Sequence, residues 1–353
     1  MAVTQLNVQR FRCVDLAQLN CSPHENLIVG RNASGKTTLL ESLFFLGHGR
    51  SFRGTPARGL IQDQTDDFVL FAKLSQPDGQ LGIQGSKKGV TVKIDGSRAH
   101  SRSSLVSRLP VQVIEPGIHK LIEEGPTQRR SYLDWGVFHV EQMFYSSWRR
   151  YRKALDQRNA GLKEHLPAKE IALWNDTLIA AGEAVNQQRL DYLAKLAPFL
   201  DAAGMALFDT PLECAFYRGW SEDYTLAEAM AANYERDKKL ARTHAGPHRA
   251  DIRVRFGARM AKARVSRGQQ KLIAAGLILA QLALFEQSQG KPAVLLIDDP
   301  AAELDSHSLG RLLEYARDIP AQRFITALEQ RLVATNSDAR VFHVEHGKVE
   351  SLD

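Results

Sequence analysis

Short segments of alternating apolar and polar residues occupy the first third of the chain, as far as about residue 115. Because successive side chains of a strand point to opposite faces, this alternation predicts half-buried β-strands. Asp95-Gly96 marks a tight turn, and Glu115-Pro116-Gly117 ends the last strand of the region. The predicted strands are the amphipathic N-terminus and residues 68–74, 81–85, 90–94 and 111–114.

From about Leu121 the apolar residues recur at helical spacing, which predicts helices packed against one another. The clearest stripe comprises Ile171, Trp174, Leu178, Ala181, Val185, Leu193, Leu196 and Leu200. Strand signals return at residues 252–256, 293–297, 323–326 and 340–344, separated by helices, which predicts a mixed sheet packed on both sides. We therefore expect an α/β fold, with residues 1–120 and 241–353 as one discontinuous domain and 121–240 as an inserted helical arm.

Residues 28–43, IVGRNASGKTTLLESL, contain a phosphate-binding loop, because Gly30, Gly35, Lys36 and Thr37 match G-x-x-x-x-G-K-[ST] between a predicted strand and a predicted helix. Backbone N–H groups and the helix N-terminus attract phosphates there. We expect Lys36 to bridge the β- and γ-phosphates and Thr37 to bind Mg²⁺. The predicted nucleotide contacts of this loop are Gly30, Arg31, Asn32, Ala33, Ser34, Gly35, Lys36, Thr37 and Thr38.

An apolar strand that ends in acids, AVLLIDDPAAELD at residues 293–305, supplies the carboxylates that the phosphate loop lacks. We expect Asp298 to hold Mg²⁺, directly or through water, and Asp299 to polarise the attacking water. Together with Lys36, these two residues form the predicted catalytic group. Taken alone, the segment also fits a buried strand that ends in a charged turn.

A second anion site is predicted at VSRGQQK, residues 265–271, which precedes an apolar stretch that reaches Phe285. Ser266 can cap this helix, and Gly268 leaves the backbone open to close approach. Because the helix is apolar nearly all round, we expect it to be buried with its N-terminus presented at a surface.

Composition indicates an ordinary soluble protein, with 44% apolar and 24% charged residues in a chain of 353. No apolar run approaches the roughly 20 residues of a membrane-spanning helix, and the N-terminus lacks a signal-peptide core. Cys13, Cys21 and Cys214 show no metal-ligand spacing, which favours free thiols in a reducing compartment. We expect a cytoplasmic protein without a membrane partner.

The net charge of +6 and pI of about 9.2 favour a polyanionic partner. Basic residues gather in two clusters, each of which is either a solvated face or a binding surface. The first lies between Lys87 and Arg108, and the second between Arg149 and Arg158 among the aromatic residues Tyr145, Trp148 and Tyr151.

These motifs together resemble the ATP-binding-cassette ATPases, whose pattern is a phosphate loop, a serine-glycine-glutamine signature, an acidic strand and a following turn, here Glu303-Leu304-Asp305. The resemblance implies that ATP and Mg²⁺ bind between two copies of the chain. It also implies that Ser266, Gly268 and Gln269 of one copy reach the γ-phosphate held by the other, and that Asp305 lies at the dimer seam.

The insertion between Lys36 and Asp298 is too long for a transporter cassette and is similar to that of DNA-associated heads such as Rad50 and the SMC proteins. Four segments resemble the RecF family: GHGRSFR (47–53), RRSYLDWGVFH (129–139), GPHRAD (246–251) and SRGQQK (266–271). This resemblance implies an ABC-type ATPase head with an antiparallel β subdomain and a short helical arm. It also implies an ATP-dependent homodimer that binds gapped DNA, where single strand meets duplex, and helps RecR and RecO load RecA.

An ABC transporter ATPase subunit and an SMC-like structural DNA protein are the alternatives.

Two departures from the cassette pattern affect the predicted site. Asp299 replaces the usual catalytic Glu, so its carboxylate lies about 1.5 Å farther back and hydrolysis should be slow. Residues 323–330, RFITALEQ, lack the strand-end His of transporters, so no sensor residue is assigned. Gln112, at the end of a predicted strand, is a further candidate for metal and water contact.

Candidate DNA contacts follow from the same resemblance. Basic side chains on the closed head surface would neutralise phosphates, and the candidates are Arg50, Arg53, Lys87, Lys88 and Lys93. Trp135, Phe138 and Trp148 either stack on unpaired bases or pack the root of the arm. His248 with Arg249 either lines the nucleotide or DNA face or forms a structural turn.

Overall fold

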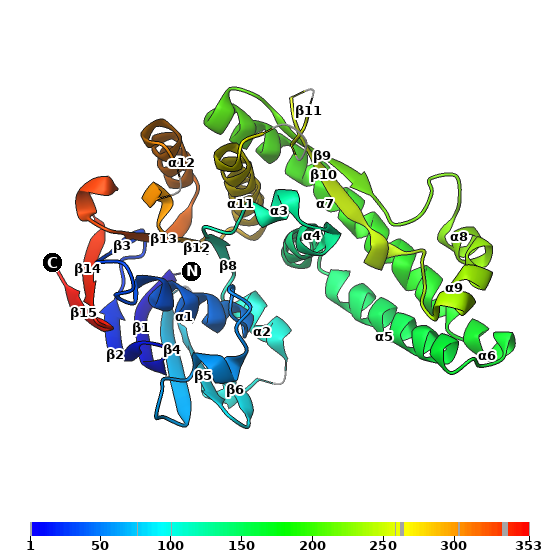
Figure 1. The fold of residues 1–353 in the computed structure, drawn as a ribbon, viewed down its shortest axis with the longest axis horizontal. Helices are drawn as coiled ribbons and strands as arrows, with labels where there is room; N and C mark the ends of the chain where they lie inside the picture. Colours follow the sequence, from blue (N-terminus) through cyan, green and yellow to red (C-terminus); the bar gives the residue numbers. More distant parts are fainter. Residues whose placement is uncertain are drawn as a thin grey trace. The chain divides into compact units, whose positions relative to one another are not determined.

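The chain forms two compact units in a computed structural model (Figure 1). They comprise Met1–Ile118 with Ala275–Asp353, and His119–Ala274. The structure describes residues 2–75, 77–99, 101–257, 259–261, 265–302, 304–333 and 338–352, without the side chains of Arg102, Arg259, Met260 and Leu332. The predicted arm ends at residue 240, whereas the second unit reaches Ala274. Head and arm as functional domains stay a prediction.

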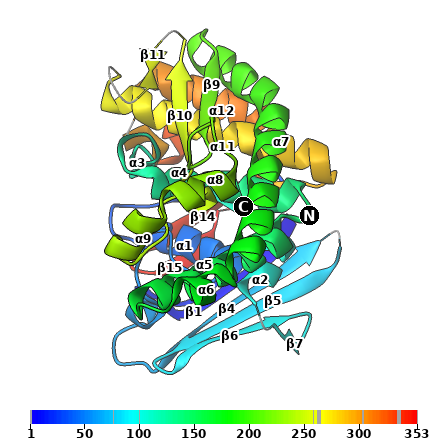
Figure 2. The same cartoon turned by 90° about the vertical axis from the view of Figure 1, so that its right-hand side faces the viewer.

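An antiparallel sheet in the first unit contains the predicted N-terminal strand and the strands predicted at 68–74, 81–85 and 90–94 (Figure 2), whereas residues 111–114 form a strand of the second sheet. The order of the antiparallel sheet is β2-β1-β4-β5-β6-β7. Inward side chains such as Leu6, Phe68 and Leu81 are fully buried, while the polar residues between them face outward. The strands are β1 (Ala2–Phe11), β2 (Val14–Asn20), β4 (Asp67–Ser75), β5 (Gly79–Ser86), β6 (Gly89–Ile94) and β7 (Ser97–Arg98).

A second sheet, mostly parallel, carries the phosphate loop. Its order is β15-β14-β3-β13-β12-β8, and only β15 runs antiparallel to its neighbour. The carboxyl ends of the parallel strands therefore meet at one edge, where α/β proteins place their ligands. The strands are β3 (Glu25–Val29), β8 (Val111–Ile114), β12 (Ala293–Ile297), β13 (Ala321–Ala327), β14 (Arg340–Glu345) and β15 (Lys348–Ser351).

Helix α1 (Lys36–His48) lies in the apolar core between the two sheets. Leu40 and Phe45 of α1 pack in one cluster with Phe68 of the antiparallel sheet and Phe324 of the parallel sheet. The other helical elements of this unit are α2 (Arg102–Arg108), α12 (Ser306–Asp318), η1 (Ala57–Leu60), η3 (Pro300–Ala302) and η4 (Gln330–Leu332).

Helix α11 (Arg267–Gln289) is buried along its apolar length, as predicted. Among the described residues it is the one helix long and apolar enough to cross a membrane, but 78% of its most apolar window is buried inside the fold. This burial is what a helix in a protein core shows.

The second unit combines helices with a small antiparallel sheet of order β11-β10-β9. Helices α5 (Phe144–Lys163) and α7 (Asn175–Phe208) lie side by side (Figure 1). The predicted stripe is split between α6 (Ala168–Ala172) and α7. The remaining elements are α3 (Lys120–Glu123), α4 (Pro126–Val140), α8 (Leu226–Ala232), α9 (Tyr234–Leu240), η2 (Pro247–Arg249), β9 (Leu212–Tyr217), β10 (Asp251–Phe256) and β11 (Arg259–Met260). Because β10 pairs with β9 along its whole length, the unit extends past residue 240.

A buried charge cluster ties α5 to the segment around α9. The Arg158 guanidinium is 1% exposed and donates to Asp237 Oδ2 at 2.9 Å and to Thr243 Oγ1 at 2.6 Å. Asp237 is fully buried and also accepts from the backbone N–H of His244 at 3.0 Å. Each charge is satisfied by the other, so removing one leaves its partner buried and unpaired.

Replacing Arg158 by Met should therefore destabilise the protein by about 3–5 kcal/mol, because Asp237 loses its counter-charge in the interior. The control is Arg152→Met on the same helix, where an exposed pair with Asp156 at 3.7 Å is lost. That change should cost no more than about 0.5 kcal/mol. Urea unfolding followed by circular dichroism measures both, and equal losses for the two variants would contradict the structural role of Arg158.

Candidate nucleotide-binding site

The phosphate loop joins β3 to α1 and is hydrogen-bonded to the β14–β15 hairpin. The backbone N–H of Gly347 donates to Ser34 O at 2.8 Å. Gly30 has φ +155°, and a Cβ there would lie 2.2 Å from Val344 O, so only glycine fits this close approach. Gly35, with φ +116°, precedes α1, which begins at Lys36 rather than at the predicted Thr38. The helix N-terminus is thus part of the loop.

Lys36 is folded over the loop carbonyls. Its Nζ donates to Gly30 O at 2.7 Å and to Arg31 O at 2.9 Å. An ammonium has three N–H groups, so these two bonds leave one donor for an anion in the loop. Burial lowers the Lys36 pKa, while the carboxylates of Asp299 and Asp298 act against that shift.

Asp298 joins three segments through one carboxylate oxygen. Its Oδ1 accepts from the Thr37 hydroxyl and from the Thr326 hydroxyl, each at 2.9 Å. The parallel register of β12 and β13, with Ile297 opposite Ile325, brings Asp298 and Thr326 to the same level. The predicted pair Thr37 and Asp298 therefore does meet at the carboxyl edge of the sheet.

Asp299 turns away from its neighbour because its backbone has φ +45°. Its N–H donates to Thr326 Oγ1 at 2.8 Å, and its own Oδ1 is buried without a hydrogen-bond partner among the described residues. Burial raises the Asp299 pKa; Lys36 opposes the shift, and Asp298 adds to it. A carboxylate with an unused acceptor beside the phosphate loop can bind a water or an ammonium.

A pocket of about 290 Å³ opens over the loop, and two of its residues lie outside both the predicted nucleotide contacts and the predicted catalytic group. Cys13 lies with Sγ 3.4 Å from Thr38 Oγ1, and Arg53, predicted to contact DNA, lines the same pocket. The full lining is Cys13, Asn32, Ala33, Ser34, Gly35, Lys36, Thr37, Thr38, Arg53 and Asp299.

Arg53 is held near the loop by a buried network on α1. Glu41 is fully buried and accepts from the Arg12 guanidinium at 2.5 and 2.9 Å and from Ser51 Oγ at 2.5 Å. The Ser51 hydroxyl then accepts from the backbone N–H of Arg53 at 3.0 Å. The segment GHGRSFR is thus tied to the phosphate-loop helix, which its sequence alone does not indicate.

The residues at this edge fit Mg²⁺ by their chemistry. Thr37 and Asp298 offer the oxygen ligands that Mg²⁺ prefers, and this ion commonly takes one or two carboxylates together with substrate phosphates. The described residues hold no group of three His, Cys, Asp or Glu that binds a metal ion unaided. The protein would therefore supply part of the oxygen ligands of Mg²⁺, and the phosphates of a nucleotide would supply others.

The structure does not bring Gln112 to this edge. Gln112 on β8 lies opposite Leu295 on β12, and its buried amide donates to Gln281 Oε1 on α11 at 2.6 Å. Leu295 is three residues before Asp298, or roughly 10 Å along a strand. In this structure the Gln112 side chain joins β8 to α11, and its metal contact stays a prediction that this bond does not support.

The signature segment is exposed at the start of α11. Ser266 N–H donates to Gln269 Oε1 at 3.1 Å, and Gln269 N–H donates to Ser266 Oγ at 3.3 Å, so Ser266 caps the helix as predicted. A Cβ on Gly268 would meet only Ser266 Oγ at 4.0 Å, so nothing described covers this turn. Its backbone is open to a ligand.

Asp305 is the N-cap of α12. Its Oδ1 accepts from the backbone N–H groups of His307 at 3.1 Å and Ser308 at 3.0 Å, and its Oδ2 accepts from Ser308 Oγ at 2.7 Å. These bonds hold the Asp305 pKa below its usual value. Asp305 is exposed, and Glu303 of the same turn lies outside the described residues.

The other basic candidates for DNA contact lie on the surface of the first unit. Arg50, Lys88 and Lys93 are exposed, and Lys87 pairs with the exposed Asp66 at 2.9 Å. Which of them meets DNA stays a prediction.

Within the second unit, the predicted stacking aromatics pack against their neighbours. Trp135 is 9% exposed and lies 4.4 Å from the His139 ring, and Phe138 meets the Tyr145 ring edge-on at 5.8 Å. These contacts fit the packing alternative.

His248 also has a structural setting. Its Nδ1 bonds the Tyr151 hydroxyl at 2.5 Å and its Nε2 lies 3.0 Å from Thr243 O, which fits the structural turn. Burial lowers the His248 pKa to about 4.

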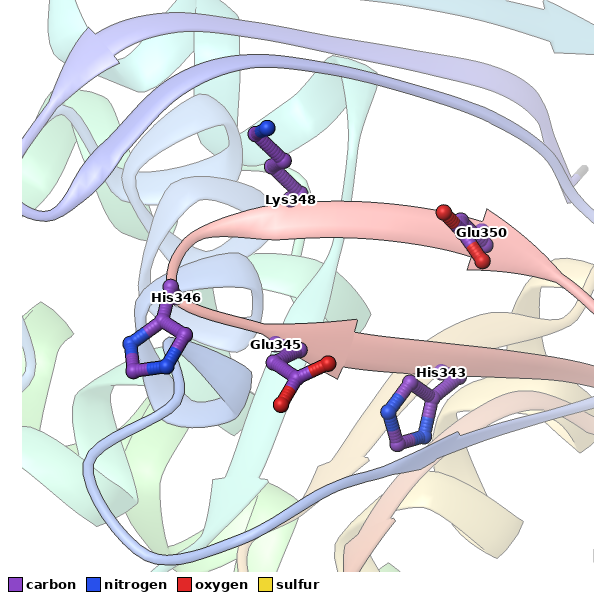
Figure 3. Close-up of a pocket in the computed structure, with 5 residues that line it drawn as sticks. All are labelled: His343, Glu345, His346, Lys348 and Glu350. Atoms are coloured by element: carbon purple, nitrogen blue, oxygen red, sulfur yellow. The ribbon is translucent and has the colours of Figure 1, made fainter.

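A smaller pocket, of about 230 Å³, lies on the hairpin that supports the phosphate loop. Figure 3 shows His343 and Glu345 along β14, Lys348 and Glu350 along β15, and His346 at the turn. His343 pairs with Glu350 across the strands, and Glu345 pairs with Lys348. The Gly347 N–H of this hairpin donates to Ser34 O.

Comparisons with known proteins agree with this geometry. The family model described as RecF/RecN/SMC N terminal domain matches residues 2–350. The DNA replication and repair protein RecF of Hydrogenovibrio crunogenus is 38% identical over 98% of each chain, and that of Shewanella oneidensis is 38% identical over 100% of each.

Solved structures give the same result for the fold. A structure of the recombination mediator protein RecF with ATP, in the RecFOR pathway, matches with a TM-score of 0.89 and 25% identity, over 100% of this chain and 98% of that one. An SMC head bound to the C-winged helix domain of ScpA matches with a TM-score of 0.62 at 15% identity, over 100% of this chain and 98% of that one, which shows the fold alone. The fold is thus that of an ABC-type ATPase head, and the chain belongs to the RecF family within the RecF/RecN/SMC group.

Proposed function

We propose that this protein is an ATP-dependent DNA-binding protein of recombinational repair and replication, which closes as a dimer over ATP on gapped DNA. The observation that carries the proposal is the meeting of Thr37, Asp298 and Thr326 at the strand ends, next to a pocket over the phosphate loop that Lys36 and Thr37 line. Family membership supports it, because relatives of the same length are named for DNA replication and repair and one is solved with ATP.

Binding of the triphosphate rests on the loop backbone and on Lys36. The loop N–H groups and the N-terminus of α1 would donate to phosphate oxygens, and the remaining N–H of Lys36 would donate to another. Arg53, in the same pocket, adds a second cation that can fork onto phosphate. Mg²⁺, held by Thr37 and Asp298, would supply further positive charge to the phosphates.

Hydrolysis in this proposal is slow and serves release. Asp299 lies beside the phosphate loop with a buried, unused acceptor oxygen, which suits it to hold the attacking water. Thr326 fixes Asp299 by accepting its backbone N–H, so Thr326 is a positioning residue that sequence reasoning did not assign. Because the shorter Asp replaces the usual Glu, hydrolysis would be slow and would set how long the dimer stays closed.

Dimerisation would complete the site. Ser266, Gly268 and Gln269 stand at the exposed start of a 23-residue helix, where backbone N–H groups and the helix dipole attract an anion. A second copy presenting this turn to the γ-phosphate would make ATP a removable link between the two heads. Asp305, exposed at the start of α12, is placed by the same proposal at the seam.

DNA and protein partners follow from the family. Closed heads would present Arg50, Lys87, Lys88 and Lys93 to phosphates at a junction of single and double strands, with strong salt dependence. RecR and RecO are proposed protein partners because the similar RecF structure belongs to the RecFOR pathway, and the family resemblance adds RecA. The proposed location is the cytoplasm.

Replacing Thr326 by Val should lower kcat for ATP by about tenfold or more, because a hydrogen bond to a carboxylate contributes about 1.5–3 kcal/mol and Asp299 loses its anchor. KM should change little, since the loop and Lys36 are intact. Thr326→Ser keeps the hydroxyl and should retain most of the activity. If the valine and serine variants hydrolyse ATP equally, Thr326 does not position the catalytic carboxylates.

Ser266→Arg should abolish ATP-dependent dimerisation while leaving ATP binding to each monomer within about twofold, because the bulky cation occupies the turn that meets the neighbour's phosphate. Sedimentation velocity with and without a non-hydrolysable ATP analogue measures the dimer, and equilibrium binding of a fluorescent ATP analogue measures affinity. DNA binding should lose its enhancement by ATP.

The control for this variant is Ser97→Arg, which adds the same side chain at an exposed position of β7. That protein should dimerise with ATP as the native protein does. Normal dimerisation of the Ser266 variant would remove the proposed role of the signature in the neighbouring subunit.

A further inference from the structure

A basic groove of about 560 Å³ runs along the first half of α5 in the second unit. It is separate from the pocket over the phosphate loop, and every residue that lines it comes from one helix. The lining residues are Tyr145, Ser146, Trp148, Arg149, Arg150, Arg152 and Lys153. Nine residues of helix span about 12 Å, so the groove is as long as a short stretch of extended chain.

The cations of this groove are mostly unneutralised. Arg152 pairs with Asp156 at 3.7 Å, but Arg149, Arg150 and Lys153 have no ion pair among the described residues. All three are exposed, and Arg149 and Lys153 stand at i and i+4 on the helix, where like charges repel. This arrangement weakens the isolated helix, and a polyanion in the groove would offset that repulsion.

Aromatic rings alternate with these cations. Trp148 is fixed as the floor, since it stacks on Phe144 at 6.3 Å and on Tyr151 at 5.7 Å. The Arg189 guanidinium lies 5.4 Å from the Trp148 ring and is itself held by Asp134 at 2.7 Å. The floor is therefore rigid before any ligand arrives.

Tyr145 is the ring available to a ligand. It is 36% exposed at the end of the groove, and the Arg149 guanidinium lies 5.6 Å from its centroid. A partly exposed aromatic ring beside a row of cations without ion pairs is the combination with which proteins bind single-stranded nucleic acid without sequence preference.

We propose that this groove binds the single-stranded part of the DNA substrate, with phosphates on Arg149, Arg150 and Lys153 and an unpaired base on Tyr145. The inference rests on the DNA binding proposed above and adds a second contact surface, on the arm. A duplex offers the same phosphates but no free base face for Tyr145, and an acidic peptide offers charge but few planar groups. Single-stranded DNA uses both features of the groove.

The test measures binding of full-length protein to fluorescein-labelled oligo(dT) and to a blunt duplex of the same length, by anisotropy over a series of NaCl concentrations. The variant is Arg149→Gln/Arg150→Gln/Lys153→Gln. Its affinity for oligo(dT) should fall about tenfold or more, and its salt slope should drop by about 2, at roughly 0.7 per phosphate contact. Duplex affinity should fall less.

The matched control removes three exposed positive charges from the same unit but outside the groove: Lys163→Gln/Lys169→Gln/Lys239→Gln. It should change oligo(dT) affinity by less than about twofold. An equal loss in both triple variants would mean that only overall charge matters and would overturn the proposal.

Tyr145→Leu separates stacking from charge, because it keeps the cations and removes the ring. Oligo(dT) affinity should fall about fivefold or more with the salt slope unchanged, as expected when one stacked base is lost. Unchanged affinity would overturn the assignment of Tyr145. If the triple variant loses binding to poly-glutamate but keeps its affinity for oligo(dT), the occupant of the groove is an acidic protein surface instead.

These outcomes are distinguishable from failure of the function proposed above. The groove variants should keep ATP-dependent dimerisation and the ATP enhancement of duplex binding, both of which Ser266→Arg should lose. If the native protein binds neither DNA in any nucleotide state, both proposals fall. If the native protein binds DNA and the groove variants bind oligo(dT) equally well, the groove proposal alone falls.

Discussion

The hydrogen bonds to Asp298 Oδ1 are the interaction on which the nucleotide site depends. Through this one oxygen, Thr37 at the start of α1 is joined to Asp298, 261 residues later, and to Thr326, 28 residues beyond that. Both donors are hydroxyls, and each lies 2.9 Å from this oxygen. Parallel pairing of β3, β13 and β12 brings the three segments to one edge.

Two further features of the site follow from this junction. Asp299 is oriented by Thr326, which gives its backbone N–H an acceptor and leaves its own carboxylate beside the loop. The loop itself is held from the other side by Gly347 of the β14–β15 hairpin. The site is thus fixed by strand ends and one hairpin, and the segment that reaches Arg53 is tied to it by the buried Glu41.

Much of this arrangement could be predicted from the sequence, because its motifs are local. Gly30 to Thr38 carry the loop geometry in consecutive residues, and an apolar strand ending in Asp298 identifies the opposing carboxylate. Thr326 could not be found in this way, since its role comes from the register of β13 against β12. Cys13 and Arg53 reach the pocket through tertiary packing. The position of Gln112 opposite Leu295, bonded to Gln281, could not be predicted because a strand assignment alone does not say how far a residue lies from the strand's end.

The central claim is that one copy's phosphate loop and another copy's signature form a single site around ATP. Mixing Lys36→Ala with Ser266→Arg tests it most directly, because each variant keeps the half that the other lacks. If the claim holds, neither variant alone hydrolyses ATP above background, while their mixture regains turnover from heterodimers with one complete site. A mixture no more active than the sum of its parts would contradict the shared site and place the signature's role within a single chain.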